Sequence, residues 1–170
     1  MADHVLEQED QLVDPICKKL GDFVNRLFQE DLSITQQKRC LQIKNLLIDI
    51  ERVADMSEDI AQFAIERIRN NVPFSSQAIE ELSCLWRHTY CTFTSAVKAF
   101  EQNDKLLAKQ VCEMESEFDI LYWQTRQRHI ERLDMGVCTP EANVIFTEAL
   151  RNLERISDHA DNLGVSVMRA

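Results

Sequence analysis

The chain has 170 residues, of which 45% are apolar and 28% charged, and its formal net charge is −10. This length suffices for one ordinary domain or two very small ones, and the apolar content is that of a folded globular protein. Partners that are bound by charge alone, such as nucleic acid or anionic lipid, require basic patches, so the acidic balance argues against both. An acidic surface does suit cations.

Few residues in the chain break helices, because only three Gly and three Pro occur. We therefore expect long helices joined by short loops. The six cysteines include no C-x-x-C motif, which favours free thiols over a zinc ribbon. The acidic start, MADHVLEQED, lacks the apolar core of a secretory leader, and no run of apolar residues is long enough to span a membrane. These features predict a cytoplasmic chain that does not itself cross the membrane.

Five segments have the 3.6-residue apolar periodicity of amphipathic helices, near 3–28, 38–70, 76–101, 104–133 and 140–168. The polar stretches between them offer helix caps, with Ser33 or Thr35 before the second segment and Thr139-Pro140 before the fifth. Gly136 is suited to end the fourth. No segment alternates with period two, so the sequence predicts an all-α protein with five long helices in antiparallel bundles.

The second and fifth segments repeat each other at an offset of 103 residues. Apolar positions agree, and Glu51, Arg52 and Asp55 fall on Glu154, Arg155 and Asp158. Agreement of charged and apolar positions together indicates an internal repeat, because any two amphipathic helices share an apolar register.

The first and fourth segments repeat at an offset of 105, which places Asp10 and Asp14 on Glu115 and Asp119. The third segment has no counterpart at the N-terminus. We therefore expect two three-helix units with the first helix of the first unit missing: an incomplete unit over 1–73 and a complete one over 74–170.

Each repeat thus carries an acidic residue four positions before an Asp on two consecutive helices. Like charges at this spacing repel. If the two helices of a hairpin pack antiparallel, four carboxylates converge, and protons or cations must neutralise them. Oxygen ligands suit hard ions such as iron, manganese, magnesium or calcium, with zinc as another option. The competing interpretation is a solvated face whose acids pair with Arg52 and Arg155 in weak surface salt bridges.

The stretches NLERISDHADNL at 152–163 and DIERVADMSEDIA at 49–61 resemble the motif helices of PhoU-type domains. That family is built from two three-helix bundles, and its repeated Glu/Asp-x-x-x-Asp motif binds multinuclear iron or other metals. The resemblance implies a metal-binding protein whose ligands come from both repeats. The residues that match the motif are Asp10, Asp14, Glu51, Asp55, Glu115, Asp119, Glu154 and Asp158, and Asp59 and Asn162 occupy the position after it where the family often has Asn.

Residues 128–162 are also similar to the end of the PhoU-like domain of sodium/phosphate cotransporters. This resemblance implies a regulatory domain that controls phosphate uptake at the inner face of the plasma membrane, with a transporter or a phosphate-signalling protein as partner. A stripe exposed by the missing helix favours a homodimer.

Three alternatives stay open. The chain is a free-standing regulator of phosphate transport, a helical dimerisation module without metal, or a metal enzyme with its site in the bundle core. The last is disfavoured, because the Glu-x-x-His pattern of di-iron bundles is absent and no nucleophile has an adjacent base. We therefore expect that the protein is not an enzyme.

Aromatic residues of the third segment share one side of the predicted helix, which favours a core face over a partner-binding stripe: Trp86, Tyr90, Phe93 and Phe100. Tyr122 and Trp123 are adjacent and cannot share a face. We expect one of these two residues near the surface.

Overall fold

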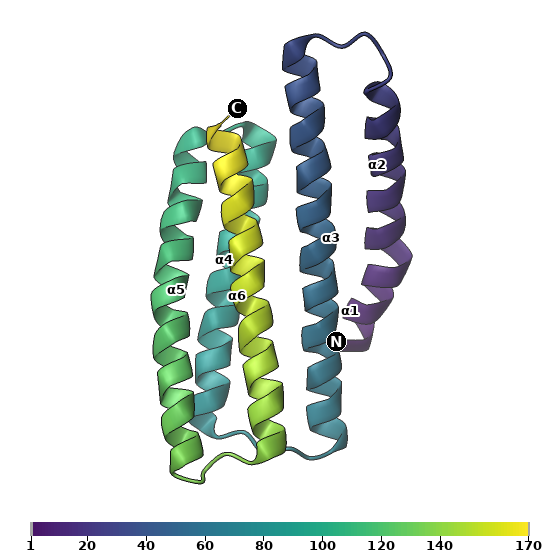
Figure 1. Ribbon diagram of the computed structural model, residues 1–170. Coiled ribbons are helices and arrows are strands. Elements are labelled where there is room, and N and C mark those ends of the chain that lie inside the picture. The colour runs from purple at the N-terminus through teal and green to yellow at the C-terminus, as the bar shows by residue number, and fades with distance from the viewer. Residues whose placement is uncertain (1, 170) are drawn as a thin grey trace.

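The computed structural model describes residues 2–169, apart from the side chains of Asp3, Glu9 and Asp10, and this part of the chain is helical with no strand (Figure 1). The predicted all-α architecture is confirmed. The N-terminal segment consists of α1 (Ala2–Gln8), the short π-helix η1 (Glu9–Val13) and α2 (Asp14–Leu27). Four long helices follow: α3 (Ile34–Arg69), α4 (Ser76–Gln102), α5 (Lys105–Asp134) and α6 (Pro140–Met168).

Side-chain caps fix where the long helices begin. Ser33 accepts a hydrogen bond from the backbone N–H of Gln36 and completes a capping box at the start of α3. Thr139 caps α6 by accepting a hydrogen bond from the backbone N–H of Ala142, with Pro140 in the first turn. Gly136 has φ of +68° just after α5, a conformation that glycine adopts without steric cost. The caps and the stop that the sequence predicts at these three positions are confirmed.

The N-terminal segment differs from the single helix expected over 3–28, because the π-helix η1 interrupts it. Pro15 lies in the first turn of α2. Its nitrogen has no proton to donate, and its ring crowds the carbonyl one turn earlier. Widening the preceding turn accommodates that ring.

The helices form two groups that meet between α3 and α6 (Figure 1). Helices α4, α5 and α6 pack against one another as a three-helix bundle, and α2 packs on α3 to form a helical hairpin. Hydrogen bonds from α3 to α6 pair Gln42 with Ser166 and Asp49 with His159, so these two helices run antiparallel. The structure thus has a two-helix hairpin beside a three-helix bundle, and the division into two repeats at residue 73 stays a prediction.

Helix α6 lies at the centre of the hydrophobic core, in contact with α3, α4 and α5. Near the C-terminal end of α6, Leu163 and Val167 pack with Val111 of α5 and the small side chains of α4. Further toward its N-terminus, Phe146 and Leu150 pack with Phe118 of α5.

A buried ion pair joins α4 to α5. The Glu81 carboxylate accepts hydrogen bonds from Arg128 Nε at 2.6 Å and from Arg132 Nη2 at 2.7 Å. Both Glu81 and Arg132 are buried. The pairing fixes the axial position of α4 against α5, because neither charge can leave its partner without being stranded in the interior.

Helix α2 leaves an apolar stripe in solvent. Ile16, Leu20 and Phe23 are 51%, 44% and 51% exposed. At the 105-residue offset, Leu20 and Phe23 fall on Thr125 and Arg128 of α5, which lie against α4. The stripe therefore occupies the surface that a third helix covers in the second repeat.

Two aromatic residues expected in the core are on the surface instead. Trp86 and Tyr90 of α4 are 54% and 59% exposed and stack on each other with ring centroids 5.7 Å apart. The face of α4 that packs inward carries the smaller Leu85, Thr89 and Ala96. Small side chains let helices approach closely, which turns the large aromatic rings outward.

Trp123 is 60% exposed, while Tyr122 packs against the core, so the expectation that one of these two lies near the surface is confirmed. No helix in the described part of the chain is long and apolar enough to span a membrane. All six cysteines are free.

Candidate functional site

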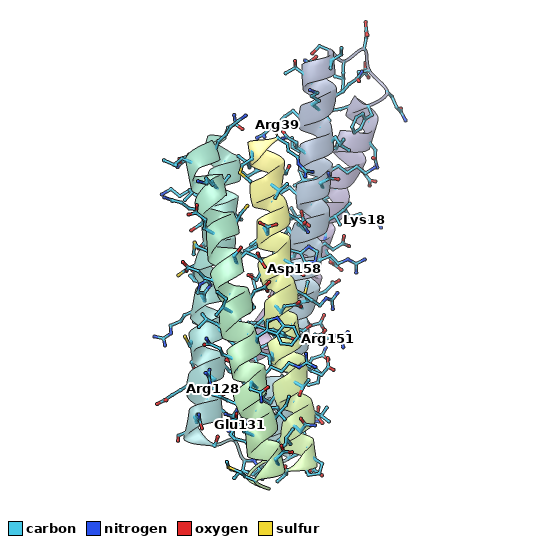
Figure 2. The ribbon with its side chains drawn as sticks, turned by 60° about the vertical axis from the view of Figure 1, so that its left-hand side comes forward. Lys18, Arg39, Arg128, Glu131, Arg151 and Asp158 are labelled. Carbon is cyan, nitrogen blue, oxygen red and sulfur yellow. The ribbon has the colours of Figure 1, made fainter. Side chains whose placement is uncertain are left out.

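The acidic residues of the second repeat lie on the neighbouring helices α5 and α6. Glu115 and Asp119 come from α5, and Glu154 and Asp158 from α6, where Figure 2 shows Asp158 partway along the helix. The two backbones approach closely nearby, because a Cβ on Gly164 would lie 3.0 Å from the carbonyl oxygen of Ala108. A glycine at this position lets the two helices bring their acidic positions together.

These carboxylates form one electrostatic cluster, as the pKa of Glu115 shows. Burial raises this pKa to about 7, with further contributions from the negative charges of four neighbours, which are Asp119, Asp161, Asp158 and Glu154. Burial also raises the pKa of Glu154 and of Asp158, and the charge of Asp119 contributes to both. The cluster favours any species that supplies positive charge.

Basic side chains oppose these shifts only in part. The charges of Arg155 and Arg151 lower the pKa of Glu154, and that of His159 lowers the pKa of Asp158, yet the net shift of both acids is upward. His159 is bound elsewhere, since its Nδ1 lies 2.8 Å from an oxygen of Asp49 on α3. No salt bridge joins these four acids to a Lys or Arg in the described residues. The solvated-face interpretation predicts that Arg155 forms salt bridges with these acids, and no such salt bridge occurs among the described residues.

Asp161 is a member of the cluster that is missing from the predicted set of ligands. It contributes to the raised pKa of Glu115 and interacts with the thiol of Cys112, whose pKa burial and this carboxylate raise to about 12. Cys112 therefore stays a protonated thiol at neutral pH. Asp158 follows Glu154 by four residues and Asp161 follows Asp158 by three, so all three lie on one helix face, and this pattern could have identified Asp161.

Asn162 points to another part of the molecule. It lines a groove between α3 and α6, whereas its neighbour Asp161 interacts with α5. Consecutive residues of a helix differ by about 100° in direction, so the two cannot face the same partner. The structure thus places Asp161 with the acids of α5, and Asn162 apart from them.

The acidic residues of the first repeat are more open to solvent. Asp14 and Glu51 lie near Cys17, since both contribute, after burial, to the raised pKa of that thiol. Asp55 pairs with Arg52 at 3.6 Å, and Asp59 is exposed. The side chain of Asp10 lies outside the described residues. Asp14 and Glu51 thus lie close to each other across the α2–α3 contact, while Asp55 has a basic partner on its own helix.

Among the described residues, no group of three or more His, Cys, Asp or Glu side chains is gathered tightly enough to hold a metal ion. Carboxylates with no cation between them repel and turn apart. As a donor set, the acids of α5 and α6 nevertheless fit a hard cation, because they offer only oxygen and come from two helices in close contact. Rotation of their side chains suffices to change the separation of the oxygens.

The architecture and the acidic cluster define an all-helical protein of two repeats with carboxylate-rich helical hairpins. Residues 87–167 match the family model of the PhoU domain. The matched stretch contains the acidic residues of α5 and α6.

The chain is similar to known proteins over most of its length. It is 26% identical to phosphate-specific transport system accessory protein PhoU homolog 1 of Thermotoga maritima, over 96% of this chain and 69% of that protein. The crystal structure of PhoU from Pseudomonas aeruginosa has a TM-score of 0.92 at 23% identity, covering 98% of this chain and 79% of that one. The phosphate transport system regulatory protein PhoU from Streptococcus pneumoniae has a TM-score of 0.85 at 15% identity, with coverages of 98% and 77%. These structures establish the fold over nearly the whole chain.

Proposed function

We propose that this protein is a free-standing regulator of phosphate transport. The support comes from the match of residues 87–167 to the PhoU domain model and from the similarity of the chain to a protein named as an accessory of a phosphate-specific transport system. Its partners would be transport or phosphate-signalling proteins, and its place of action the cytoplasm. A second copy of the chain would cover the apolar stripe on α2, giving a homodimer.

We further propose that the acids of α5 and α6 hold metal ions, with iron as the first candidate and zinc, manganese or magnesium as alternatives. The observation that carries this proposal is the mutual charge of Glu115 and its four acidic neighbours, which a cation would relieve. Glu115, Asp119, Glu154 and Asp158 would supply the ligands, joined by Asp161. The acids of the first repeat would form a second, more open site: Asp10, Asp14, Glu51, Asp55 and Asp59.

A cation held in this way would act on the shape of the protein and not on a substrate. It would neutralise carboxylates from two helices at once, so its binding would stabilise the contact between α5 and α6. We propose no catalytic role, because the Glu-x-x-His pattern of di-iron enzymes does not occur in the chain.

A second candidate function is that of a domain attached to a sodium/phosphate cotransporter. The similarity of residues 128–162 to the end of such a domain favours it, and these residues span the turn from α5 to α6 and much of α6. In that case the protein would act at the inner face of the plasma membrane, with the membrane part of the transporter as its partner.

Elemental analysis by mass spectrometry tests the metal proposal. We expect one or more equivalents of iron or another metal in the purified protein, and a loss of that metal in a Glu154→Gln/Asp158→Asn variant. The matched variant Glu51→Gln/Asp55→Asn removes the same groups from the first repeat, and it should lose the metal of the more open site while keeping the metal held between α5 and α6. Metal-free protein in all samples, even after incubation with each metal in turn, would overturn the proposal and favour the metal-free dimerisation module.

Phosphate uptake tests the regulatory role separately. In cells that lack their own gene for this protein, we expect the chain to restore control of radiolabelled phosphate uptake by external phosphate, and the Glu154→Gln/Asp158→Asn variant to fail. Uptake that ignores the presence of the chain would contradict a regulatory role whatever the metal content. Cross-linking in the same cells distinguishes the two candidate functions by the protein that is captured, either a soluble regulator or transporter component, or a sodium/phosphate cotransporter.

A further inference from the structure

A groove of about 860 Å³ lies between the N-terminal part of α3 and the C-terminal part of α6, with Asn103 of the α4–α5 turn at its edge. Its floor includes Leu46 and Leu163. The groove is separate from the acidic cluster, whose members Asp161 and Glu154 interact with α5. Its volume falls within the range of pockets that bind small molecules, which is about 300–1,000 Å³.

The charge of this groove is opposite to that of the protein. Lys38, Arg39 and Arg169 line it, within a chain of net charge −10. Its one carboxylate, on Asp49, is already bound to His159 at 2.8 Å. No Asp or Glu side chain in the described residues forms a salt bridge with any of the three basic side chains.

Two of the polar groups in the groove are held in place. The Arg39 guanidinium lies over the ring of Phe100, 4.4 Å from its centroid, and Figure 2 shows Arg39 beside the C-terminal end of α6. The ring fixes one face of the guanidinium, and Nη1 donates a long hydrogen bond to Gln42 Oε1 at 3.4 Å, so the remaining N–H groups of the edge are available to a ligand. Gln42 spans the groove by donating to the Ser166 carbonyl at 3.1 Å. The amides of Asn45, Asn103 and Asn162 add uncharged donors.

Among the described residues, the opposite end of the α3–α6 contact contains no comparable groove, because apolar side chains fill the space between the helices. There Val72 and Phe74, in the connection between α3 and α4, pack with Ala142 and Ile145 of α6. That end is filled by apolar side chains of the chain itself, with the Arg67 guanidinium over the Phe74 ring at its side. The groove instead combines an apolar floor with basic and amide side chains, which is the composition of a ligand site.

We propose that the groove binds a small polyanion, namely a di- or triphosphate group that is either free or attached to an organic body. The charge-bearing side chains that would recognise it are Lys38, Arg39 and Arg169. Guanidinium groups bind phosphate oxygens through paired N–H donors, and lysine adds a mobile charge. A macromolecular polyanion is a poorer fit, since the rest of the surface is acidic and would repel it.

Isothermal titration calorimetry on the whole chain tests this proposal, with pyrophosphate, adenosine triphosphate and adenosine as probes. The buffer contains EDTA, so that a metal bridging phosphate to the acidic cluster cannot contribute. We expect saturable binding of the two phosphate probes, none of adenosine, and affinity that falls as salt is added. Equal affinity for the two phosphates would assign recognition to the phosphate group alone, and tighter binding of adenosine triphosphate would add a contact with the organic body.

The variant Lys38→Gln/Arg39→Gln/Arg169→Gln should lower the affinity by about tenfold or more, because it removes every unpaired charge of the groove. The control Lys18→Gln/Arg69→Gln/Arg87→Gln removes the same number and kind of charges elsewhere and should bind nearly as the unmodified protein does. Binding should also survive in Glu154→Gln/Asp158→Asn, which separates this site from the proposed metal centre. Absence of saturable binding at low salt, or equal losses in the two triple variants, would overturn the proposal.

Discussion

The α2–α3 and α5–α6 hairpins carry the same acidic pattern, yet only the second is covered by a third helix. In the second hairpin, α4 packs along both helices, and Glu115 is partly removed from water, so that its pKa rises to about 7. In the first, Glu51 and Asp55 are exposed and the apolar stripe of α2 faces solvent. The comparison shows that a motif defines which groups are present, whereas the packing around it decides how strongly they interact.

The largest expected effect concerns the ion pair that holds α4 in place. We expect Glu81→Gln to lower the free energy of unfolding by about 3 kcal/mol, because it strands Arg132 in the interior without its anion. The matched position in the first repeat has no such pair, since Phe23 falls on Arg128. Urea unfolding measures the loss, and Glu80→Gln, at the exposed neighbour, is the control. Equal effects of the two substitutions would mean that the pair does not hold α4.

The next effect concerns the close approach of α5 and α6. A methyl group at Gly164 would lie 3.0 Å from the Ala108 carbonyl oxygen and 3.3 Å from a methyl of Val111. We expect Gly164→Ala to lower the free energy of unfolding by about 1 kcal/mol, since the overpacking outweighs the better helix propensity of alanine.

The first repeat provides the matched comparison, because Ala61 occupies the position equivalent to Gly164. There we expect Ala61→Gly to be the destabilising change, by about 1 kcal/mol, through helix propensity. Thermal unfolding of both variants compares them directly. A Gly164→Ala protein that is more stable than the parent would show that the two helices can separate at no cost.

The sequence alone predicts most of this fold, because the helix boundaries depend on local signals. Ser33, Thr139 and Gly136 mark their helix ends by their own chemistry, and the structure confirms them. The interruption at η1 also had a local signal, Pro15, whose effect on the preceding turn is a matter of elementary geometry.

The direction of side chains is harder to predict, because it depends on which neighbours a helix has. Trp86 and Tyr90 share a helix side with other aromatic residues, yet they lie outside because α4 packs through its smaller residues. Asp161 and Asn162 differ by one position but face α5 and α3, respectively. The apolar stripe of a helix predicts which side of it is buried. For a residue at the edge of that stripe, the helix that it faces can be predicted only when the positions of the two neighbouring helices are known.

A smaller effect is expected in the pH dependence of stability, which tests the acidic cluster between α5 and α6. The pKa of Glu115 is raised from 4.5 to about 7, so the folded state binds this proton more tightly than the unfolded state does. Its contribution to stability is complete below about pH 4.5 and is lost as the pH rises through about 7.

In metal-free protein with EDTA, we therefore expect the stability of the parent relative to Glu115→Gln to fall by about 1 kcal/mol between pH 4.5 and pH 8, after allowance for solvent screening. Urea unfolding at a series of pH values measures it. Glu113→Gln, at an exposed position of the same helix, is the control. Parallel stability curves for the parent and the Glu115→Gln protein would show that the cluster does not retain its proton.

The smallest effect on stability is expected at the apolar stripe of α2, which no third helix covers in the described part of the chain. Leu20 and Phe23 are 44% and 51% exposed, so Leu20→Gln/Phe23→Gln should change the free energy of unfolding of a monomer by only about 0.5 kcal/mol. The mass in solution should respond more, because a second copy that covers the stripe would lose apolar contact area. Sedimentation equilibrium would then show a dimer for the parent and a shift toward monomer for the variant. If the parent is already a monomer, the stripe is not a contact between two copies, and the acidic hairpin of the first repeat stays as open in solution as it is in the structure.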